Sequence, residues 1–156
     1  MRRLIILFLL VFTTPALAQY WGHYTNARFG YAIDVPPDFE GNGEASDGAG
    51  QAFYRTEAEQ SLEAWGGPMD TGLDALAQSL AADNAALGWG ITMQTSTPQW
   101  ATLSGLRDRR SFFQRLIVLC DGKSYASMRV DFPTADLNAV EPVLQGLARS
   151  FVAEGC

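Results

Sequence analysis

The sequence predicts a single α+β domain in which an antiparallel sheet of about six or seven strands carries helices packed on it. Two long strand patterns joined by a short turn form the centre of the predicted sheet, and two segments with helical spacing of apolar residues provide its cover. The composition agrees, because 156 residues that are 47% hydrophobic and 18% charged suffice for one core but are few for two ordinary domains.

The N-terminus has the pattern of a cleaved signal peptide. Met1-Arg2-Arg3 is positively charged, the uncharged stretch Leu4 to Phe12 follows, and Ala16-Leu17-Ala18 is a small-x-small cleavage site. A membrane anchor would need about 20 apolar residues, whereas this stretch is interrupted at Thr13-Thr14-Pro15. We therefore expect cleavage after Ala18, no stable membrane anchor after cleavage, and one periplasmic or secreted domain over residues 19–156.

The charge of the mature chain argues against nucleic acid as a partner. Removal of Arg2 and Arg3 leaves nine basic and seventeen acidic residues, a net charge of −8, and so acidic a chain repels phosphates. The distribution is uneven. Gln19 to Gly105 contains two basic and eleven acidic residues, while Leu106 to Cys156 contains seven and six.

Strand patterns dominate the first part of the mature chain. Phe29 to Val35 alternates large apolar with small or polar residues and stops at Pro36-Pro37, which indicates a half-buried strand. Asp38 to Gly50 is expected to be a Gly-rich acidic loop. Gln51 to Arg55 and Ser61 to Trp65, separated by a polar turn, are expected to form an antiparallel hairpin.

Two segments have the periodicity of amphipathic helices. The first is expected to begin at a cap formed by Thr71 with the acidic residue three positions later, and to end before Gly88. In the second, Pro142 is compatible with a helix only near its start, so we expect Asn138 to be the N-cap and Glu141 to complete a capping box.

The centre of the predicted sheet is a hairpin of Arg110 to Cys120 with Lys123 to Phe132. The connecting Asp121-Gly122 suits a type I′ turn, which fixes the register. The expected cross-strand pairs are Ile117 with Ala126, Phe113 with Val130, Val118 with Tyr125 and Arg115 with Met128. Both faces are then apolar, so both are expected to be covered. The preceding strands are expected at Trp89 to Thr95 and Gln99 to Leu103, with a turn at Ser104-Gly105.

The segment Tyr24 to Pro36 resembles the opening Y-x-N-x-R-F-G-[FY]-x-[IV]-x-x-P of small exported proteins of Gram-negative bacteria with a PsbP-like pattern. Asp47 to Phe53, Leu62 to Gly66 and Ala148 to Phe151 resemble later motifs of these proteins, although Asp47-Gly48-Ala49-Gly50 departs from the tighter turn of the family. The resemblance implies an antiparallel sheet between helices and an accessory or interaction role, and it assigns no catalytic residue.

The sequence offers little to hold a cofactor or metal, and we expect neither. His23 is the single histidine, and zinc normally needs three or four protein ligands. The loop from Asp38 to Gly50 begins like a calcium loop, but its twelfth position, Ala49, lacks the bidentate carboxylate. This favours a solvated acidic loop over a calcium site.

Four arginines, Arg107, Arg109, Arg110 and Arg115, concentrate positive charge at the start of the central hairpin. Guanidinium groups suit carboxylates or phosphates, so this strand is the candidate contact for a protein partner or a small anionic ligand. Internal ion pairing is the alternative. Arg115 shares a face with Phe113 and Ile117, so we expect it either to be buried with a carboxylate or to point into a pocket.

These observations favour an exported accessory or binding protein without evident catalytic activity. One alternative is a small exported hydrolase that uses a carboxylate pair, such as Asp34 with a neighbour on the adjacent strand. Another is an acidic inhibitor of a basic extracellular enzyme, for which the charge of −8 would steer association.

Cys120 and Cys156 are the two cysteines of the chain, and a pair in an exported protein is usually oxidised. We expect them to form a disulfide, which the chain-entropy account values at about 4 kcal/mol. Titration of thiols in the unfolded, unreduced exported protein should find none, and two free sulfhydryls would contradict the pairing.

Overall fold

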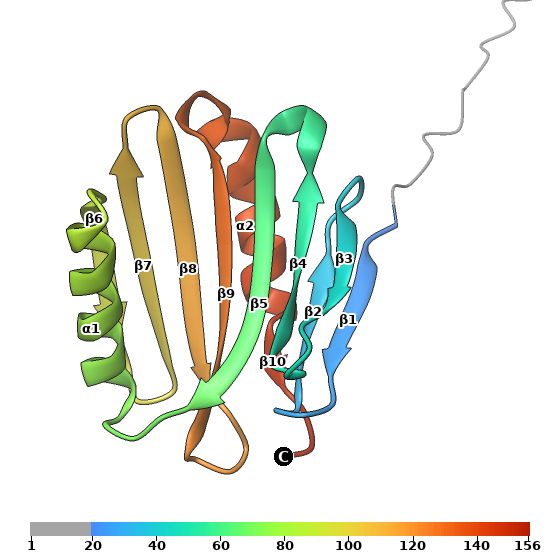
Figure 1. Cartoon of the computed structure of the whole chain (residues 1–156), viewed down its shortest axis with the longest axis vertical. Coiled ribbons are helices and arrows are strands. Elements are labelled where there is room, and N and C mark those ends of the chain that lie inside the picture. Colours follow the sequence, from blue (N-terminus) through green and yellow to red (C-terminus); the bar gives the residue numbers. More distant parts are fainter. Residues whose placement is uncertain (1–19) are drawn as a thin grey trace, which may run out of the picture.

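The computed structural model describes residues 20–156, which form two antiparallel sheets and two α-helices (Figure 1). The expected signal peptide lies outside the described residues. The seven-stranded sheet has the order β3-β4-β5-β9-β8-β7-β6, and the three-stranded sheet has the order β1-β2-β10. The strands are β1 (Gly22–Asn26), β2 (Tyr31–Val35), β3 (Glu40–Glu44), β4 (Gly50–Arg55), β5 (Gln60–Pro68), β6 (Gly90–Ser96), β7 (Trp100–Arg107), β8 (Arg110–Val118), β9 (Ser124–Pro133) and β10 (Val152–Ala153). The helices are α1 (Leu73–Ala86) and α2 (Leu137–Ser150), with 3₁₀ turns at Thr56–Ala58 and Thr134–Asp136.

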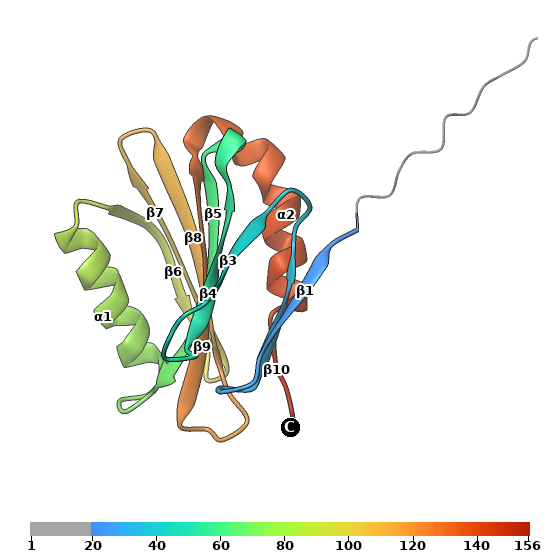
Figure 2. The same cartoon turned by 45° about the vertical axis from the view of Figure 1, so that its right-hand side comes forward.

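The elements form three layers around the large sheet, and the predicted α+β fold is confirmed. In Figure 2 helix α1 lies on one side of the large sheet, and α2 with the small sheet lies on the other. Each side has its own hydrophobic core, one centred on Met128 and Val130 and one on Leu103 and Phe112. Neither helix of residues 20–156 is long and apolar enough to cross a membrane.

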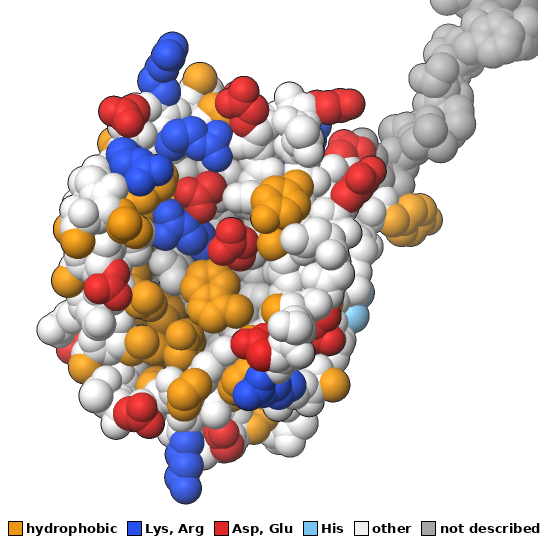
Figure 3. Space-filling model, viewed as in Figure 1, with side chains coloured by type: hydrophobic (Ala, Val, Ile, Leu, Met, Phe, Trp, Pro, Cys, Tyr) orange, Lys and Arg blue, Asp and Glu red, His pale blue; other side chains and the backbone are white. Residues whose placement is uncertain are grey.

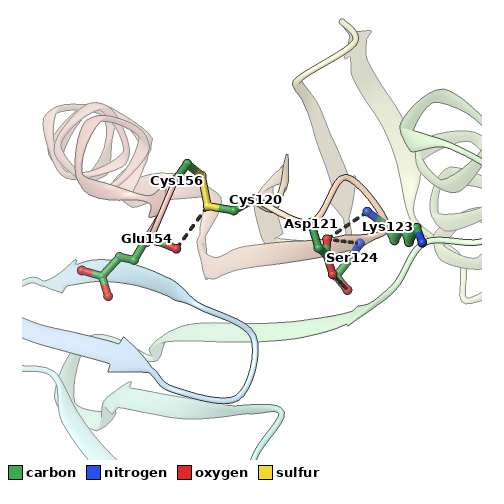
Figure 4. Close-up of a disulfide and its surroundings, with 6 residues drawn as sticks. All are labelled: Cys120, Asp121, Lys123, Ser124, Glu154 and Cys156. Atoms are coloured by element: carbon green, nitrogen blue, oxygen red, sulfur yellow. Dashed lines mark hydrogen bonds between the residues drawn. A yellow bond between two sulfur atoms is a disulfide. The ribbon is translucent and has the colours of Figure 1, made fainter.

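The register of the central hairpin is as predicted, and its turn is not. Ile117 pairs with Ala126, and the other three expected pairs also form. A type I′ turn needs positive φ at both central residues, but only Gly122 of the pair has one, at 64°. Instead the Asp121 carboxylate accepts hydrogen bonds from the amides of Lys123 (2.9 Å) and Ser124 (2.8 Å), which stabilises a longer loop in the same register (Figure 4).

Two turns and loops differ from the sequence prediction. The β4–β5 hairpin forms as expected, but strand β3 lies inside the stretch expected to be an acidic loop. Strand β7 continues through Ser104-Gly105 and turns at Asp108, whose φ is 54°. The lack of a side chain at Gly105 lets the Phe112 ring pack against the strand, since a Cβ at this position would lie 2.5 Å from the ring.

Neither predicted helix cap forms. Helix α1 starts at Leu73 after Gly72, whose φ is 82°, and no side chain caps it. Asn138 lies inside α2, because a 3₁₀ turn leads directly into a helix that begins at Leu137. Pro142 is therefore in the second turn of α2, still near its start, without the capping box that was expected to place it there.

The small sheet was missed apart from β2, and Asn26 anchors it. This side chain is fully buried; its Oδ1 accepts from the Phe29 amide, and its Nδ2 donates to Glu44 Oε1 at 2.8 Å and to the Gly48 carbonyl at 2.9 Å. A buried amide must be satisfied in this way. Asn26 thereby fastens the β3–β4 loop to the small sheet.

The disulfide joins the central hairpin to the C-terminus. Cys120 and Cys156 are bonded, with their Cα atoms 5.2 Å apart, as the cysteine count predicted (Figure 4). Strand β10 runs along β2 just before Cys156. The bond therefore holds the small sheet against the hairpin loop.

The Asp121 loop gives an expectation for acid stability. Hydrogen bonds from the Lys123 amide and then from Ser124 lower the pKa of the Asp121 carboxyl. A lowered folded-state pKa adds stability above the ordinary value of about 3.9, and that stability is lost as pH falls through the folded pKa. We expect Asp121→Ala to lower the free energy of unfolding at neutral pH and to match the parent in strong acid. The exposed Asp70→Ala is the control, and a pH-independent difference would contradict the expectation.

Candidate functional site

The face of the large sheet on the α1 side is only partly covered. Helix α1 packs on β6, β7 and β8, where this face is apolar at residues such as Phe112 and Leu116. On β9 the same face carries Ser127, Arg129 and Asp131. Figure 3 looks onto this face and shows acidic, basic and hydrophobic side chains gathered over the middle of the sheet. We call the part formed by β9, β5 and β4 the open face.

Arg129 joins α1 to the open face. Its Nε and Nη2 donate to the two carboxylate oxygens of Asp131 at 2.7 and 3.2 Å, and its Nη1 donates to Asn84 Oδ1 of α1 at 2.7 Å. The guanidinium carbon also lies 4.0 Å from the Phe112 ring centroid and 5.2 Å from that of Trp89. Forked donors and stacking together favour arginine at this position.

A pocket of about 330 Å³ lies between the end of α1 and the sheet. It is lined by Glu63, Trp65, Leu80, Asp83, Asn84, Leu87, Trp89, Gln114 and Arg129. Gln114 is 1% exposed, and its Nε2 donates to Ser127 Oγ at 3.0 Å. Its Oε1 is buried with no hydrogen-bond partner among the described residues. A buried acceptor without a hydrogen bond lowers the free energy of unfolding, and few buried polar atoms in proteins lack one. This oxygen therefore singles out the pocket as a candidate site.

A second cavity, of about 360 Å³, continues the first across the open face. It is bordered by β4, by the β3–β4 loop and by Glu63 and Trp65 of β5, which line both cavities. Leu87, 67% exposed, and Tyr54, 44% exposed, add uncovered apolar surface at the end of α1 and on β4. The open face is therefore an elongated surface.

The four arginines expected to act together are divided among three places. Arg107 donates to the Leu87 carbonyl at 3.0 Å and stacks on Trp89, so it caps the end of α1. Arg110 donates to the Glu59 carbonyl at 2.7 Å, and with the exposed Arg109 it lines a cavity of about 590 Å³ at the β7–β8 turn. Of the four arginines predicted to form one basic strand, Arg109 and Arg110 therefore lie together and the other two lie elsewhere.

Within residues 20–156, Arg115 lacks the carboxylate that was one of its two expected environments. It points toward α2, where its guanidinium lies 4.6 Å from the Trp100 ring centroid. Among the described residues it has no carboxylate partner, and its Nε is buried without a hydrogen bond. Burial lowers the pKa of this guanidinium. The Trp100 ring therefore contacts this guanidinium where a carboxylate was expected.

The remaining candidate groups are engaged locally. Asp34 faces a histidine across the strand pair and not a second carboxylate, with His23 Nδ1 at 2.8 Å from its Oδ1. In the acidic stretch Glu44 binds Asn26, and Asp47 accepts from the Ala49 amide. Within residues 20–156 no three His, Cys, Asp or Glu side chains gather as a metal site would require.

The residues of the open face were not found by sequence reasoning. Gln114 interrupts the apolar stretch around Phe112 and Leu116, whereas Arg129 occupies a polar position in the alternation of its strand and gives no such signal. A polar residue inside a strand that is otherwise apolar is a usable signal, because burying it demands a partner. Glu63 and Trp65 gave no such signal, since both suit an ordinary half-buried strand.

Comparison with solved structures identifies the fold. A cyanobacterial PsbP (CyanoP) from Synechocystis sp. PCC 6803 superposes with a TM-score of 0.66 at 11% identity, covering 90% of this chain and 96% of that one. The fold is PsbP-like. The Saccharomyces cerevisiae Ran-binding protein Mog1p has a TM-score of 0.63 at 13% identity over 87% of this chain and 96% of its own. A point mutant of the protein Mog1 gives 0.64 at 14% identity, over 86% of this chain and 96% of its own. No family model matches the chain, and no curated protein matches it.

Likeness at such low identity extends to the PsbP-like architecture and not to the surface residues. The three structures share the fold with this chain along nearly their whole length. Function must be argued from the side chains of this chain, because one fold carries many unrelated sites.

The bond between Asn84 and Arg129 leads to a stability test. Asn84→Ala removes a hydrogen bond to a largely buried guanidinium, so we expect the free energy of unfolding to fall by about 1.5 to 3 kcal/mol. Gln78→Ala, on the exposed side of the same helix, should change it by no more than about 0.5 kcal/mol. Denaturant unfolding of the two variants measures both values, and equal effects would contradict the role of Asn84.

Proposed function

We propose that this chain is an exported accessory or binding protein that recognises a protein partner through the open face. The leader pattern and the Cys120–Cys156 bond support export to an oxidising compartment. The net charge of −8 for the mature chain makes nucleic acid an unfavourable partner.

The observation that carries the proposal is the uncovered half of the large sheet. A sheet face next to a hydrophobic core is normally covered by another layer. Here the face beyond α1 carries the partly exposed Trp65 and the exposed Tyr54 beside charged groups. Exposed aromatic residues among polar ones are typical of interaction surfaces. Among the solved structures of similar fold, one is described as Ran-binding, and a fold of this kind is therefore compatible with binding a protein.

The tagged mature protein, used as bait in periplasmic extract, tests this proposal. Trp65→Ala should lose the captured partner, because aromatic anchors at the centre of an interface commonly cost more than about 2 kcal/mol when truncated. Trp21→Ala is the matched control, since Trp21 lies against Gly146 of α2 on the other side of the molecule. Capture that survives Trp65→Ala would overturn the open face as the binding surface.

A small anionic ligand at the β7–β8 turn is a second candidate. Arg109 and Arg110 bring two guanidinium groups to one cavity, beside the acidic Asp108 and Glu59. Guanidinium pairs suit phosphate or carboxylate groups.

Charge reversal at the two ends of this turn separates binding from stability. Arg107→Glu should lower the free energy of unfolding by about 1 to 2 kcal/mol, because it removes a cation from the end of α1 and from Trp89. Arg109→Glu should leave stability within about 0.5 kcal/mol and abolish the effect of inorganic phosphate on the amide NMR signals of the turn. If phosphate moves none of these signals in the parent, the turn has no anion-binding role.

A further inference from the structure

The pocket between α1 and the open face contains an unused acceptor at its buried end. Gln114 Oε1 has no donor among the described residues, although the side chain is 1% exposed and its Nε2 already donates to Ser127. An exchange of the Gln114 oxygen and nitrogen would leave the nitrogen unpaired in place of the oxygen, because Ser127 Oγ is the one hydrogen-bonding neighbour of the amide among these residues. This oxygen is closed to solvent, so a ligand group reaches it only when the side chains around it move; an N–H or O–H group brought there would remove this cost.

The charges around the pocket favour a cation. Arg129 lies opposite Gln114 in the register of β8 and β9. Asp131 accepts two hydrogen bonds from its guanidinium and balances its charge, and Asn84 accepts a third. This leaves the carboxylates of Glu63 and Asp83 at the pocket, and neither forms an ion pair with a described residue. Arg107, which stacks on Trp89 and donates to the Leu87 carbonyl, adds one positive charge beside the pocket. Two carboxylates against this one unbalanced cation leave a small net negative charge around the pocket.

The walls of the pocket are apolar and aromatic. Trp65, Trp89, Leu80 and Leu87 line it beside the carboxylates. Methylene groups of a long side chain can pack on such walls while the charged end is satisfied elsewhere, and a cation is also attracted to tryptophan rings. Lysine fits this combination better than arginine. The buried acceptor and the carboxylates of Glu63 and Asp83 match the three donors of an ammonium in number, whereas a guanidinium presents five donors in a fixed planar fork.

We propose that this pocket binds the lysine side chain of a protein partner, with the ammonium donating to Gln114 Oε1 in the field of Glu63 and Asp83. A partner protein is favoured over a free amine because a second cavity of about 360 Å³ continues the pocket at Glu63 and Trp65, which gives room for the chain on either side of the lysine. This inference rests on the proposed function and specifies what the open face recognises.

NMR titration of the mature protein with a Gly-Ser-Lys-Ser-Gly peptide tests the pocket directly. The indole signals of Trp65 and Trp89 should shift, and the same peptide with acetyl-lysine should bind at least about tenfold more weakly because acetylation removes the charge. The arginine peptide should also bind more weakly. Equal binding of the lysine and acetyl-lysine peptides, or no shift at either indole, would overturn the proposal.

Two variants locate the recognition within the pocket. Glu63→Gln should weaken lysine-peptide binding and reduce its dependence on salt, whereas Glu141→Gln, the same charge change on α2, should have no effect. Gln114→Leu combined with Ser127→Ala removes the acceptor together with its partner, and should lower affinity by about tenfold. Thermal unfolding checks that each variant is folded, and Glu63→Gln keeps the test decisive if the double variant is not.

The same variants distinguish this inference from the proposed function. One outcome is that Glu63→Gln and the double variant capture the periplasmic partner as the parent does, while Trp65→Ala does not. The open face then binds a protein without recognising a lysine side chain, and this inference fails. If Trp65→Ala also captures the partner, the proposed function itself fails.

Discussion

The boundary between apolar and polar side chains on the α1 side of the large sheet is the constraint on which the arrangement of this protein depends. Toward α2 the central strands are mainly apolar, at positions such as Met128 and Phe132, with Arg115 stacked on Trp100 as the charged exception, and α2 with the small sheet covers them. Toward α1 they are apolar on β7 and at Phe112 and Leu116 of β8, and they become polar at Gln114 of β8 and Arg129 of β9. One helix suffices to cover the apolar part, and the rest of the face stays open.

Arg129 makes this boundary stable. A guanidinium at the edge of a hydrophobic core is costly unless its charge and donors are satisfied. Asp131 supplies the opposite charge, Asn84 supplies an acceptor from α1, and Phe112 supplies a ring. The same contacts that hold the helix on the sheet therefore form one wall of the pocket, so the position of α1 and the shape of the candidate site depend on each other.

The other side of the sheet is held by contacts between distant parts of the chain. Asn26 fastens the β3–β4 loop to the small sheet, and the disulfide fastens the C-terminus to the central hairpin. Both restrain segments that have little core of their own. These two contacts tie the PsbP-like fold together on the side opposite the open face, which is the surface proposed to bind a partner.

The sequence by itself determined the α+β class, the register of the central hairpin and the pairing of Cys120 with Cys156. The class and the register follow local periodicity, which holds the register although the type I′ turn does not form, and the disulfide follows the count of two cysteines; neither needs knowledge of distant contacts. Only the tertiary structure decided the small sheet, the separation of the four arginines and the open face. Gln114, Arg129 and Asn84 lie far apart in the chain, and the order in which strands join and the position where α1 packs bring them together; local patterns carry no information about either.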